Sequence, residues 1–562
     1  MQHRGGLDLD WRRAVSRREA WLTALGVFVA AAVVRAVAAV GTVFPRPEDS
    51  AYYVGVARNI AEGRGLVSDA LWSYGTPPLV FPRPAFEVWL PLPSLLAAAP
   101  AALFGGPAPM PLLDALRSAQ LVTGILGALL AVLAWRLAAD VAQERRLPPG
   151  RARVLAIGAG LTTAVYLPLI LHSVQPDSTI PFGVLVLGAC LLATRVLRDP
   201  RGARATDLRL LGIGLLLGLA ALTRNEAIWL ALAWAWLAWR APGLPRAARL
   251  RLVGVVAVVA MVVFAPWAIR DWAVYGSPLP GQAASNALSV TGFDIFAWQD
   301  PPTLSRYLAQ GPAALLGMRV DGVVHNLVSV LLLLGVPVSV IGLLALPWQA
   351  RDRALRPVVL VAATTFLVTS LVFPVATTWG TFLHAAAPAH VLLIIAALGA
   401  LDAGLARLAA RMGWVRPVAW LGALLAVGWS ALFSVALLPS AGTASADTAR
   451  TYAVLAQQLA AAGAPLDGRT PVITDFPIWM AEGERVPALA LPNEPPSSVA
   501  ALARHFDARL LVLTGDRGVW PGVLAGGDAA SACFHELALP VPSDPADAAA
   551  VKDLRAWRIA CP

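Results

Sequence analysis

Two adjacent acids, Glu48 and Asp49, are the side chains best suited to chemistry in this sequence. They follow the first long apolar stretch, residues 21–44, and precede a stretch with helical spacing at 51–62. Acids are favoured at helix N-termini, so both could simply cap this helix. A carboxylate beside a membrane-length apolar segment can also act as a general base, because it can take the proton of an attacking hydroxyl. Both interpretations stay open from these residues alone.

Four cationic residues lie near the predicted outer ends of apolar segments: Arg83, Arg224, Arg270 and His384. Arginine supplies a fixed charge and planar donors that match a phosphate. An arginine at a helix end can equally extend to the lipid headgroups, and a lone histidine is more often structural. Asp177 is interpreted as part of a turn at Pro176.

The composition indicates what kind of scaffold carries these residues. The chain has 562 residues, of which 58% are hydrophobic and 14% charged, with a formal net charge of +10. Ordinary soluble domains are about 45–50% apolar and about 25% charged, so a soluble enzyme and a disordered protein are both excluded. About 20 apolar residues span a bilayer as a helix, and we expect about eleven such spans. They are 21–44, 118–139, 154–171, 181–197, 208–222, 227–239, 252–267, 326–348, 357–373, 388–406 and 417–438.

The charges of the connecting segments alternate and give the expected topology. One alternating set holds 25 arginines and 9 acids, and the other holds 9 arginines and 12 acids. Arginine collects on the cytoplasmic side of membrane proteins, so residues 1–20 are expected in the cytoplasm and the long segment 45–117 outside. The basic balance is therefore a topology signal, and we expect no nucleic-acid partner. The protein is predicted to be a multi-pass protein of the plasma membrane.

The tail, residues 439–562, has a different character, with 13 acidic and 9 basic residues. The pattern predicts buried strands at 471–474 and 510–514, with a helix at 497–506 between them. We therefore expect a mainly α membrane domain at 21–438, followed by a small extracytoplasmic α/β domain. Cys533 and Cys561 both lie in this exported tail, where oxidation is permitted, so they are a disulfide candidate, with two buried thiols as the alternative.

Short motifs along the whole chain resemble the GT-C membrane glycosyltransferases, in particular the branch with protein O-mannosyltransferases and the lipid A aminoarabinose transferase. Members typically carry Asp-Glu-x-x-Tyr after the first span, and residues 49–53 read Asp-Ser-Ala-Tyr-Tyr. Ser50 departs from the pattern, and Glu48 could supply the second acid from the other side. Further similar segments are 57–65, 81–92, 222–227, 265–272 and 380–385.

The resemblance implies a GT-C fold and a polyprenyl-phosphate-linked sugar donor, used on the outer face of the bilayer. Asp49 or Glu48 would be the base, and Arg270, Arg224, Arg83 and His384 would bind the donor phosphate. Four residues in the matching segments would line the substrate site: Tyr52, Tyr53, Glu87 and Trp89. The acceptor hydroxyl could belong to a glycan, a protein or a lipid. No cofactor is implied, and no cluster has metal-ligand spacing in the sequence, although a divalent metal is not excluded.

Two other function classes stay open. A transporter or lipid flippase would typically show inverted repeats and charges at the bilayer midplane, whereas the ionisable residues here crowd at the outer ends. A catalytically inactive GT-C-like scaffold is the other alternative, because Ser50 stands where the second acid is usual. A donor-binding assay distinguishes such a scaffold from an enzyme.

Overall fold

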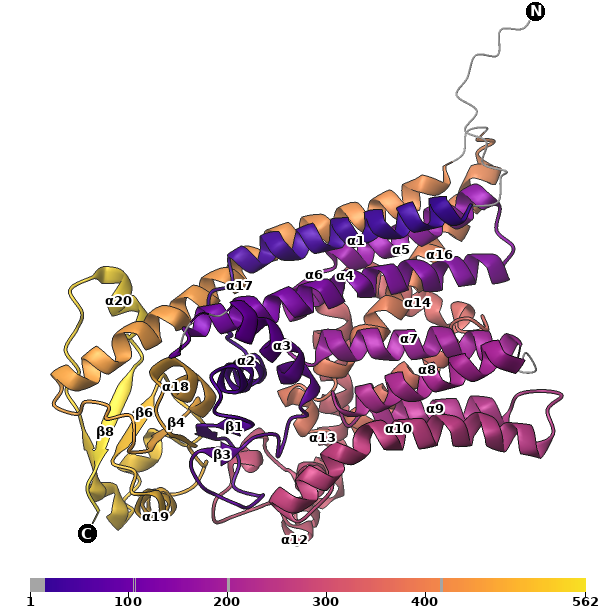
Figure 1. The fold of residues 1–562 in the computed structure, drawn as a ribbon. Helices are drawn as coiled ribbons and strands as arrows, with labels where there is room; N and C mark the ends of the chain where they lie inside the picture. The colour runs from indigo at the N-terminus through magenta and orange to yellow at the C-terminus, as the bar shows by residue number, and fades with distance from the viewer. Residues whose placement is uncertain (1–15, 105, 107, 200–202, 415–417, 562) are drawn as a thin grey trace, which may run out of the picture.

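The computed structural model describes residues 16–104, 106, 108–199, 203–414 and 418–561. Within these residues, seven helical segments are long and apolar enough to cross a membrane, and an eighth is made by a bent pair. The seven are α1 (Arg17–Val40), α4 (Leu112–Glu144), α7 (Thr179–Arg198), α10 (Arg246–Tyr275), Gly311–Gly335, α16 (Ala387–Arg411) and α17 (Ala419–Ala461). They form an elongated bundle, with the C-terminal sheet at one end of it (Figure 1).

The first helix illustrates why these segments form spans. Ser16 accepts a hydrogen bond from the Glu19 amide and Glu19 reaches back, so a capping box starts α1. Its outward side chains are apolar and exposed, among them Trp21 at 78% and Val37 at 69%. A surface of this kind belongs in lipid, because every backbone polar group is already satisfied inside the helix.

The bent pair consists of α5 (Pro149–Val165) and α6 (Leu167–Val174), which meet at 48°. Tyr166 between them is extended, and Pro168 stands in the first turn of α6. Proline lacks an amide proton and disfavours a helical residue before it, so the helix breaks at this point.

Among the described residues, seven or eight segments have the length and apolarity of a span, against the eleven that the sequence predicted. Three of the predicted spans fall on α8 (Ala203–Ala221), α9 (Ala227–Trp239) and α15 (Arg356–Leu371), which have 19, 13 and 16 residues. Apolar composition predicted them, but they are not among the segments with the length and apolarity of a span. In Figure 1, α8 and α9 run alongside α7 and α10 within the bundle.

The predicted span at 326–348 has the wrong bounds. The helical segment starts earlier, as α13 (Gly311–Val324), and continues through η2 (His325–Leu332) and η3 (Leu333–Gly335). It ends at Val336–Pro337, after which α14 (Val338–Gln349) begins. Pro337 cannot donate the hydrogen bond that would continue the helix, so the apolar run is divided there.

The long segment between α1 and α4 contains α2 (Glu48–Ala61), antiparallel strands β1 (Val67–Ser68) and β3 (Arg83–Pro84), and α3 (Leu92–Phe104). Shorter elements of later connecting segments are α11 (Ala283–Leu288), η1 (Gly292–Phe296), α12 (Leu304–Leu308), η4 (Ala376–Trp379) and η5 (Leu383–Ala385).

The C-terminal α/β region, residues 472–559, supplies five strands of a six-stranded sheet of order β2-β5-β4-β6-β8-β7, and the sixth is β2 (Ala70–Leu71). The predicted strands are confirmed as β4 (Val472–Thr474) and β6 (Leu510–Leu513), and the predicted helix as α19 (Pro496–Phe506). The other elements are α18 (Pro477–Glu484), β5 (Ala488–Ala490), η6 (Gly522–Ala525), η7 (Ala529–Cys533), β7 (Phe534–Glu536), α20 (Pro545–Ala550) and β8 (Arg555–Ile559). The predicted fold class, a polytopic helical membrane protein with a small C-terminal α/β part, is confirmed.

The sheet is joined to the membrane part in two ways that the sequence did not predict. Its edge strand β2 (Ala70–Leu71) comes from the first outer segment and pairs in parallel with β5. In addition, α17 runs without a break through Pro439, from the bundle into the sheet region. The strands β2, β5, β4 and β6 are parallel, so the segments that follow them meet at one edge.

Candidate active site

Asp49 lies in the first turn of α2 and contacts a histidine from a distant segment. Its Oδ2 is 2.8 Å from Nε2 of His384, and the Asp49 side chain is 22% exposed. His384 stands on η5, and the turn before it needs Gly380, which has φ +116°. A Cβ at Gly380 would lie 2.9 Å from Nε2 of His384, so glycine lets the backbone approach the imidazole closely.

The contact continues as a polar chain of four residues: Asp49, His384, Asp177 and His172. Nδ1 of His384 is 3.0 Å from Oδ2 of Asp177, and Nδ1 of His172 is 2.6 Å from the same oxygen. The Thr179 amide donates to Oδ1 of Asp177 over 2.7 Å. The interpretation of Asp177 as a turn residue is thus incomplete, because the turn also holds this carboxylate between two imidazoles.

The polar chain fixes charges on its members. Burial alone would lower the pKa of His384, but Asp49 and Asp177 outweigh it and raise the pKa to about 10. Burial alone would likewise raise the pKa of Asp177, but His172 and His384 hold it far below its ordinary range. At neutral pH His384 is therefore an imidazolium that donates from both ring nitrogens.

The same residues are the group best placed to hold a metal ion. One ligand atom each from His172, Asp177 and His384 lie within 4.8 Å of one another. Their spacing along the chain conceals the cluster, because His384 and Asp177 are 207 residues apart. Binding an ion requires neutral imidazoles, so a metal would compete with the proton that His384 holds.

Glu48, beside Asp49, faces the C-terminal α/β region. Its Oε2 accepts a hydrogen bond of 3.2 Å from Nε1 of Trp72, and its Oε1 accepts one of 3.4 Å from the Ile478 amide. Burial raises the pKa of Glu48 to about 7, while Arg517 opposes the shift. The two adjacent acids therefore sit in different environments.

Arg224 and Tyr53 join the Asp49 side of the site. Arg224 forms a double ion pair with Glu226, at 3.0 and 2.9 Å, and its Nη1 donates to Oγ of Ser178 over 2.8 Å. Tyr53 hydrogen-bonds to Ser178, and burial, followed by the charge of Asp49, raises the pKa of its hydroxyl. The structure thus brings together Asp49, His384, Arg224 and Tyr53, four of the residues selected from the sequence.

The remaining predicted residues form a second cluster on another side of α2. Arg83 and Glu87 are a fully buried ion pair of 2.8 Å. Tyr52 stacks on Trp89 with ring centroids 4.1 Å apart. In this structure these side chains hold the outer segment against α2, and their contact with a donor stays a prediction.

Arg270 belongs to the same second cluster. It pairs with Asp271 over 2.9 Å and lies over the rings of Trp267 and Tyr275, at 4.7 and 5.3 Å. The Tyr275 hydroxyl donates to the carbonyl of Pro84 over 2.8 Å. The phosphate-binding role expected for Arg270 therefore also stays a prediction.

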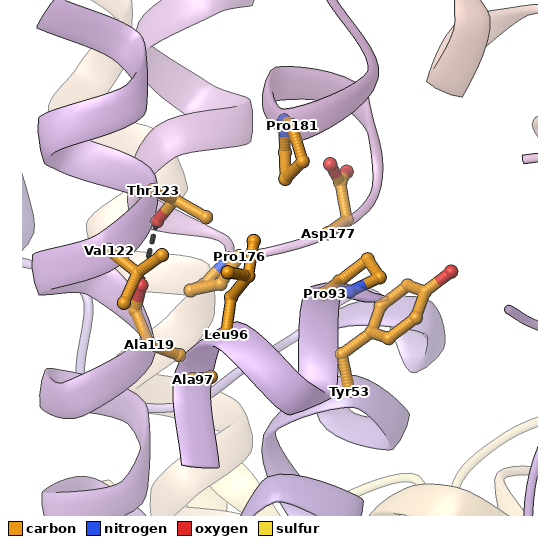
Figure 2. Close-up of a pocket in the computed structure, with 10 residues that line it drawn as sticks. All are labelled: Tyr53, Pro93, Leu96, Ala97, Ala119, Val122, Thr123, Pro176, Asp177 and Pro181. Atoms are coloured by element: carbon orange, nitrogen blue, oxygen red, sulfur yellow. Dashed lines mark hydrogen bonds between the residues drawn. The ribbon is translucent and has the colours of Figure 1, made fainter. Parts of the chain in front are cut away.

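A small apolar pocket lies directly behind Asp177 and Tyr53 (Figure 2). The turn before α7 closes one side of it, and α3 and α4 supply most of the other walls. Its lining residues are Tyr53, Pro93, Leu96, Ala97, Ala119, Val122, Thr123, Pro176, Asp177 and Pro181. An apolar space thus adjoins the charged part of the site.

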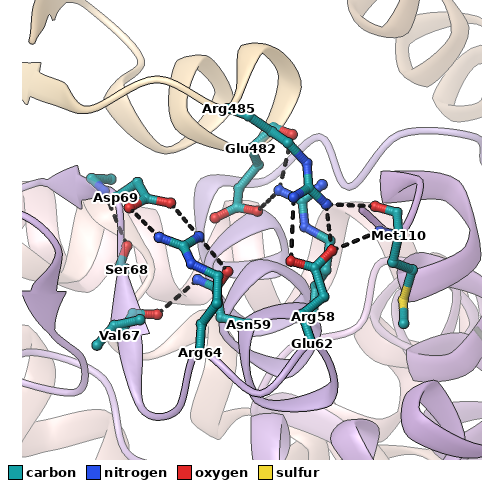
Figure 3. Close-up of polar contacts among 11 residues, drawn as sticks. Arg58, Asn59, Glu62, Arg64, Val67, Ser68, Asp69, Met110, Glu482 and Arg485 are labelled. Carbon is teal, nitrogen blue, oxygen red and sulfur yellow. Dashed lines mark hydrogen bonds and ion pairs between the residues drawn. The ribbon is translucent and has the colours of Figure 1, made fainter. Parts of the chain in front are cut away.

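Ion pairs join α2 to the C-terminal α/β region (Figure 3). Arg58 and Glu482 form a buried pair of 2.5 Å, and Arg485 contacts Glu62 over 2.6 Å. A Cβ at Gly55 would lie 2.0 Å from the Glu482 carboxyl carbon, so glycine is required where this acid meets the helix. The helix that carries Asp49 is therefore held by the C-terminal region.

The disulfide candidate residues are neighbours. Cys533 and Cys561 both carry free thiols, and Cys561 hydrogen-bonds to Cys533. Burial, together with Cys533, raises the pKa of Cys561 to about 12. The disulfide itself stays a prediction.

Comparison with known proteins identifies the fold. No family model matches the chain, and no curated protein matches it by sequence. ArnT from Cupriavidus metallidurans in the apo state is similar, with a TM-score of 0.52 at 15% identity over 97% of this chain and 100% of that chain. ArnT bound to undecaprenyl phosphate gives a TM-score of 0.53 at 15% identity, over 96% and 99%.

The oligosaccharyltransferase of Archaeoglobus fulgidus in complex with Zn and sulfate is also similar. Its TM-score is 0.56 at 14% identity, over 91% of this chain and 71% of that chain. These structure neighbours are GT-C glycosyltransferases. At such identities the similarity establishes the fold, so this chain is a multi-pass membrane protein with the GT-C fold, as the sequence motifs predicted.

Proposed function

We propose that this protein is a membrane glycosyltransferase that transfers a sugar from a polyprenyl-phosphate donor to an acceptor hydroxyl on the outer face of the bilayer. The observation that carries the proposal is the meeting of Asp49, His384 and Arg224 beside an apolar pocket. The GT-C fold supports it over a transporter, because the solved structures with this fold are glycosyltransferases.

In this proposal Asp49 is the general base. Asp49 pairs with an imidazolium and is partly exposed, whereas both oxygens of Glu48 are engaged by Trp72 and Ile478. Burial also raises the pKa of Glu48 to about 7, so a part of it keeps its proton at neutral pH and cannot accept another. The acceptor oxygen attacks the anomeric carbon, its proton passes to Asp49, and the bond from that carbon to the phosphate oxygen breaks.

The leaving group is a lipid phosphate, which departs with the bonding electron pair and stays an anion. Such a group needs fixed positive charge, since it has little need of a general acid. Arg224 and His384 supply that charge closest to Asp49, whereas Arg270 and Arg83 belong to the second cluster and are assigned lesser roles. By the resemblance to GT-C enzymes, the transfer inverts the anomeric configuration.

The apolar pocket lined by Asp177 and Tyr53 is too small for an isoprenoid unit, so the lipid chain of the donor would lie outside it. The proline, leucine and alanine side chains of its walls keep the surroundings of the polar chain apolar. We propose that Tyr53 lines the substrate site directly, and that Tyr52, Glu87 and Trp89 line it from the second cluster.

We also propose the orientation expected from the arginine distribution. Residues 1–20 would lie in the cytoplasm, 21–438 would form the membrane domain and 439–562 the extracytoplasmic domain of a plasma-membrane protein. Asp49 would then face the outside, where lipid-linked sugars meet glycan, protein or lipid acceptors.

The experiment is sugar transfer by the purified chain in lipid nanodiscs, with a panel of synthetic undecaprenyl-phosphate-linked sugars and membrane extract as the acceptor source. Asp49→Asn should abolish transfer while binding of undecaprenyl phosphate persists. Wild-type protein that binds the lipid phosphate and transfers no sugar would favour the inactive scaffold. Undiminished transfer by Asp49→Asn would contradict the assignment of the base.

A further inference from the structure

Arg517 is a cation of the C-terminal α/β region that neither the sequence motifs nor the proposed mechanism uses. It follows β6 and therefore lies at the edge where the parallel strands end. In α/β sheets this carboxyl edge is where ligands bind. The segments after β2 and β4, two other strands of the parallel set, contribute Trp72 and Asp475 to the same edge.

Three aromatic rings surround the guanidinium of Arg517. Its Cζ lies 4.6 Å from the ring centroid of Phe296, 5.1 Å from Phe476 and 5.9 Å from Trp379. We call these rings the aromatic cage. Cation–π contacts hold a guanidinium through its faces, and its N–H groups in the ring plane stay available for other partners.

Those N–H groups lack protein partners. Among the described residues, the Arg517 side chain forms no hydrogen bond or ion pair, and its buried Nε has no acceptor. A buried donor without a partner costs about 1–3 kcal/mol. Burial also lowers the pKa of Arg517, against the charges of Glu48 and Asp475.

The two nearby acids are committed elsewhere. Glu48 accepts hydrogen bonds from Trp72 and Ile478. Oδ2 of Asp475 accepts from the amide and the hydroxyl of Thr514, at 2.9 and 2.8 Å. Neither acid forms an ion pair with Arg517. Their charges act on the guanidinium from a distance, but they accept no hydrogen bond from its N–H groups.

The other arginines considered for anion binding differ in this respect. Arg83, Arg224 and Arg270 each have a carboxylate oxygen within 2.9 Å. Arg517 is near the same reaction centre, because it acts electrostatically on Glu48, the neighbour of Asp49. Its cage residue Trp379 also precedes Gly380, which packs against His384.

We propose that Arg517 binds an anionic oxygen, phosphate or carboxylate, of a substrate that enters between the C-terminal sheet edge and α2. This assignment rests on the proposed glycosyltransferase function, and it makes the C-terminal α/β region a part of the substrate site. The anion could be the phosphate of the lipid donor or a charged group on the acceptor. Both sources present the same oxygens to the guanidinium.

The experiment measures binding, so it does not depend on sugar transfer. Wild-type protein and Arg517→Gln in nanodiscs are titrated with undecaprenyl phosphate and with undecaprenol, and separately with glucose 6-phosphate and with glucose. Arg555→Gln is the matched control, because Arg555 also lies over a ring, that of Trp557 at 4.9 Å, and pairs with Glu536 at the protein surface. Arg517→Lys tests whether charge alone suffices.

We expect Arg517→Gln to lower the affinity for one of the two phosphate ligands by about tenfold or more, since a charge-assisted hydrogen bond contributes about 1.5–3 kcal/mol. If only the affinity for undecaprenyl phosphate falls, the anion that Arg517 binds belongs to the donor. If only the affinity for glucose 6-phosphate falls, the anion belongs to the acceptor. Arg517→Lys should keep part of the affinity, and Arg555→Gln all of it. Unfolding midpoints for each variant exclude a general loss of structure.

Two results would overturn the assignment of Arg517. In the first, the wild type binds undecaprenyl phosphate and Arg517→Gln binds both phosphate ligands equally well, which leaves the proposed function standing. In the second, the wild type prefers neither phosphate ligand to its neutral counterpart, which contradicts the proposed function as well. Loss of affinity for the neutral ligands to the same extent would also contradict a role in anion binding.

Discussion

The two sides of the first turn of α2 differ in how their charges are satisfied. On the bundle side, Asp49 belongs to an unbroken polar chain in which each contact is 2.6 to 3.0 Å. On the side of the C-terminal α/β region, Glu48 accepts two long hydrogen bonds and faces an arginine that pairs with no acid. Two adjacent carboxyls thus stand in different environments, and burial raises the pKa of Glu48 to about 7; different environments are how acid and base roles are divided between carboxyls in enzymes.

The two sides of α2 also differ toward the C-terminal end of the helix. At its other end α2 is held by the buried pair Arg58–Glu482, which again joins it to the C-terminal α/β region (Figure 3). The bundle side supplies the charges close to Asp49, while the C-terminal side holds the helix and supplies Arg517. Both sides are therefore needed to place Asp49.

The largest effect on folding stability is expected from breaking the ion pair between Arg58 and Glu482. Glu482→Ala leaves the Arg58 charge buried and unpaired, which should cost about 3–5 kcal/mol of folding stability. The measurement is thermal unfolding in nanodiscs together with limited proteolysis of the C-terminal region. Asp69→Ala is the control, because its pair with Arg64 is partly exposed, with side chains 19% and 37% accessible, and should contribute about 0–1 kcal/mol. Equal effects would contradict the role given to Glu482.

The next effect concerns the cysteines of the C-terminal side. If Cys533 and Cys561 oxidise outside the cell, the bridge should stabilise the C-terminal region by about 2–4 kcal/mol, and reduction should lower its unfolding midpoint. Peptide mass analysis without reductant checks the bond, and Cys190, buried within α7, is the unpaired control. Free thiols in protein purified under oxidising conditions would contradict the pairing.

On the bundle side, Asp177→Asn should slow sugar transfer by about 10- to 100-fold. The substitution removes the carboxylate between His172 and His384, and a hydrogen bond to a charged group contributes about 1.5–3 kcal/mol. The pKa of His384 should fall from about 10 because Asp177 no longer raises it. A pH profile of transfer checks this, since the activity of the variant should decline at a lower pH than that of the wild type. An unchanged profile would contradict the coupling.

The sequence predicted the parts of this comparison that are local. The acids at the start of α2, the strands β4 and β6 and the helix α19 could be predicted because hydrophobic spacing and helix-terminus preferences act within a few residues. The motifs 49–53 and 380–385 also pointed to Asp49 and His384. The cluster with Asp177 could not be predicted, because its members come together only through the packing of distant segments, 207 residues apart.

The rest of the C-terminal side escaped prediction for similar reasons. A two-residue strand such as β2 has no periodicity to detect, and the contact of Glu48 with Ile478 joins residues 430 positions apart. Arg517 lies in a loop, where nothing in the local sequence marks it. The helix lengths also escaped prediction, because an apolar run predicts burial, while helix length depends on where the bundle ends.

The smallest effects are those of pH on stability. Burial raises the pKa of Glu48 from 4.5 to about 7, so the folded state keeps a proton that the unfolded chain loses between these values. The free energy of unfolding should therefore fall as the pH rises from about 4.5 through 7. Each kcal/mol that is lost should lower the unfolding midpoint by about 2–4 °C. Burial raises the pKa of Glu484 to about 7 as well, so in Glu48→Gln the slope should become shallower. A slope as steep as that of the wild type would contradict the raised pKa of Glu48.

His384 should give a separate slope at higher pH. Its pKa is raised from 6.5 to about 10, so its stabilising contribution is complete below pH 6.5 and is lost as the pH rises through 10. Unfolding midpoints of His384→Gln across this range check the expectation. A variant with the same slope as the wild type would contradict the ion pairs with Asp49 and Asp177.

The division of roles between Asp49 and Glu48 is tested by comparing Asp49→Asn with Glu48→Gln in one sugar-transfer assay, at equal occupancy by an undecaprenyl-phosphate-linked donor. We expect Asp49→Asn to lose transfer by about 100-fold or more, the scale of a general base, while Glu48→Gln stays within about tenfold of the wild type. The reverse order, or full transfer by both variants, would contradict the division of roles between the two sides of α2.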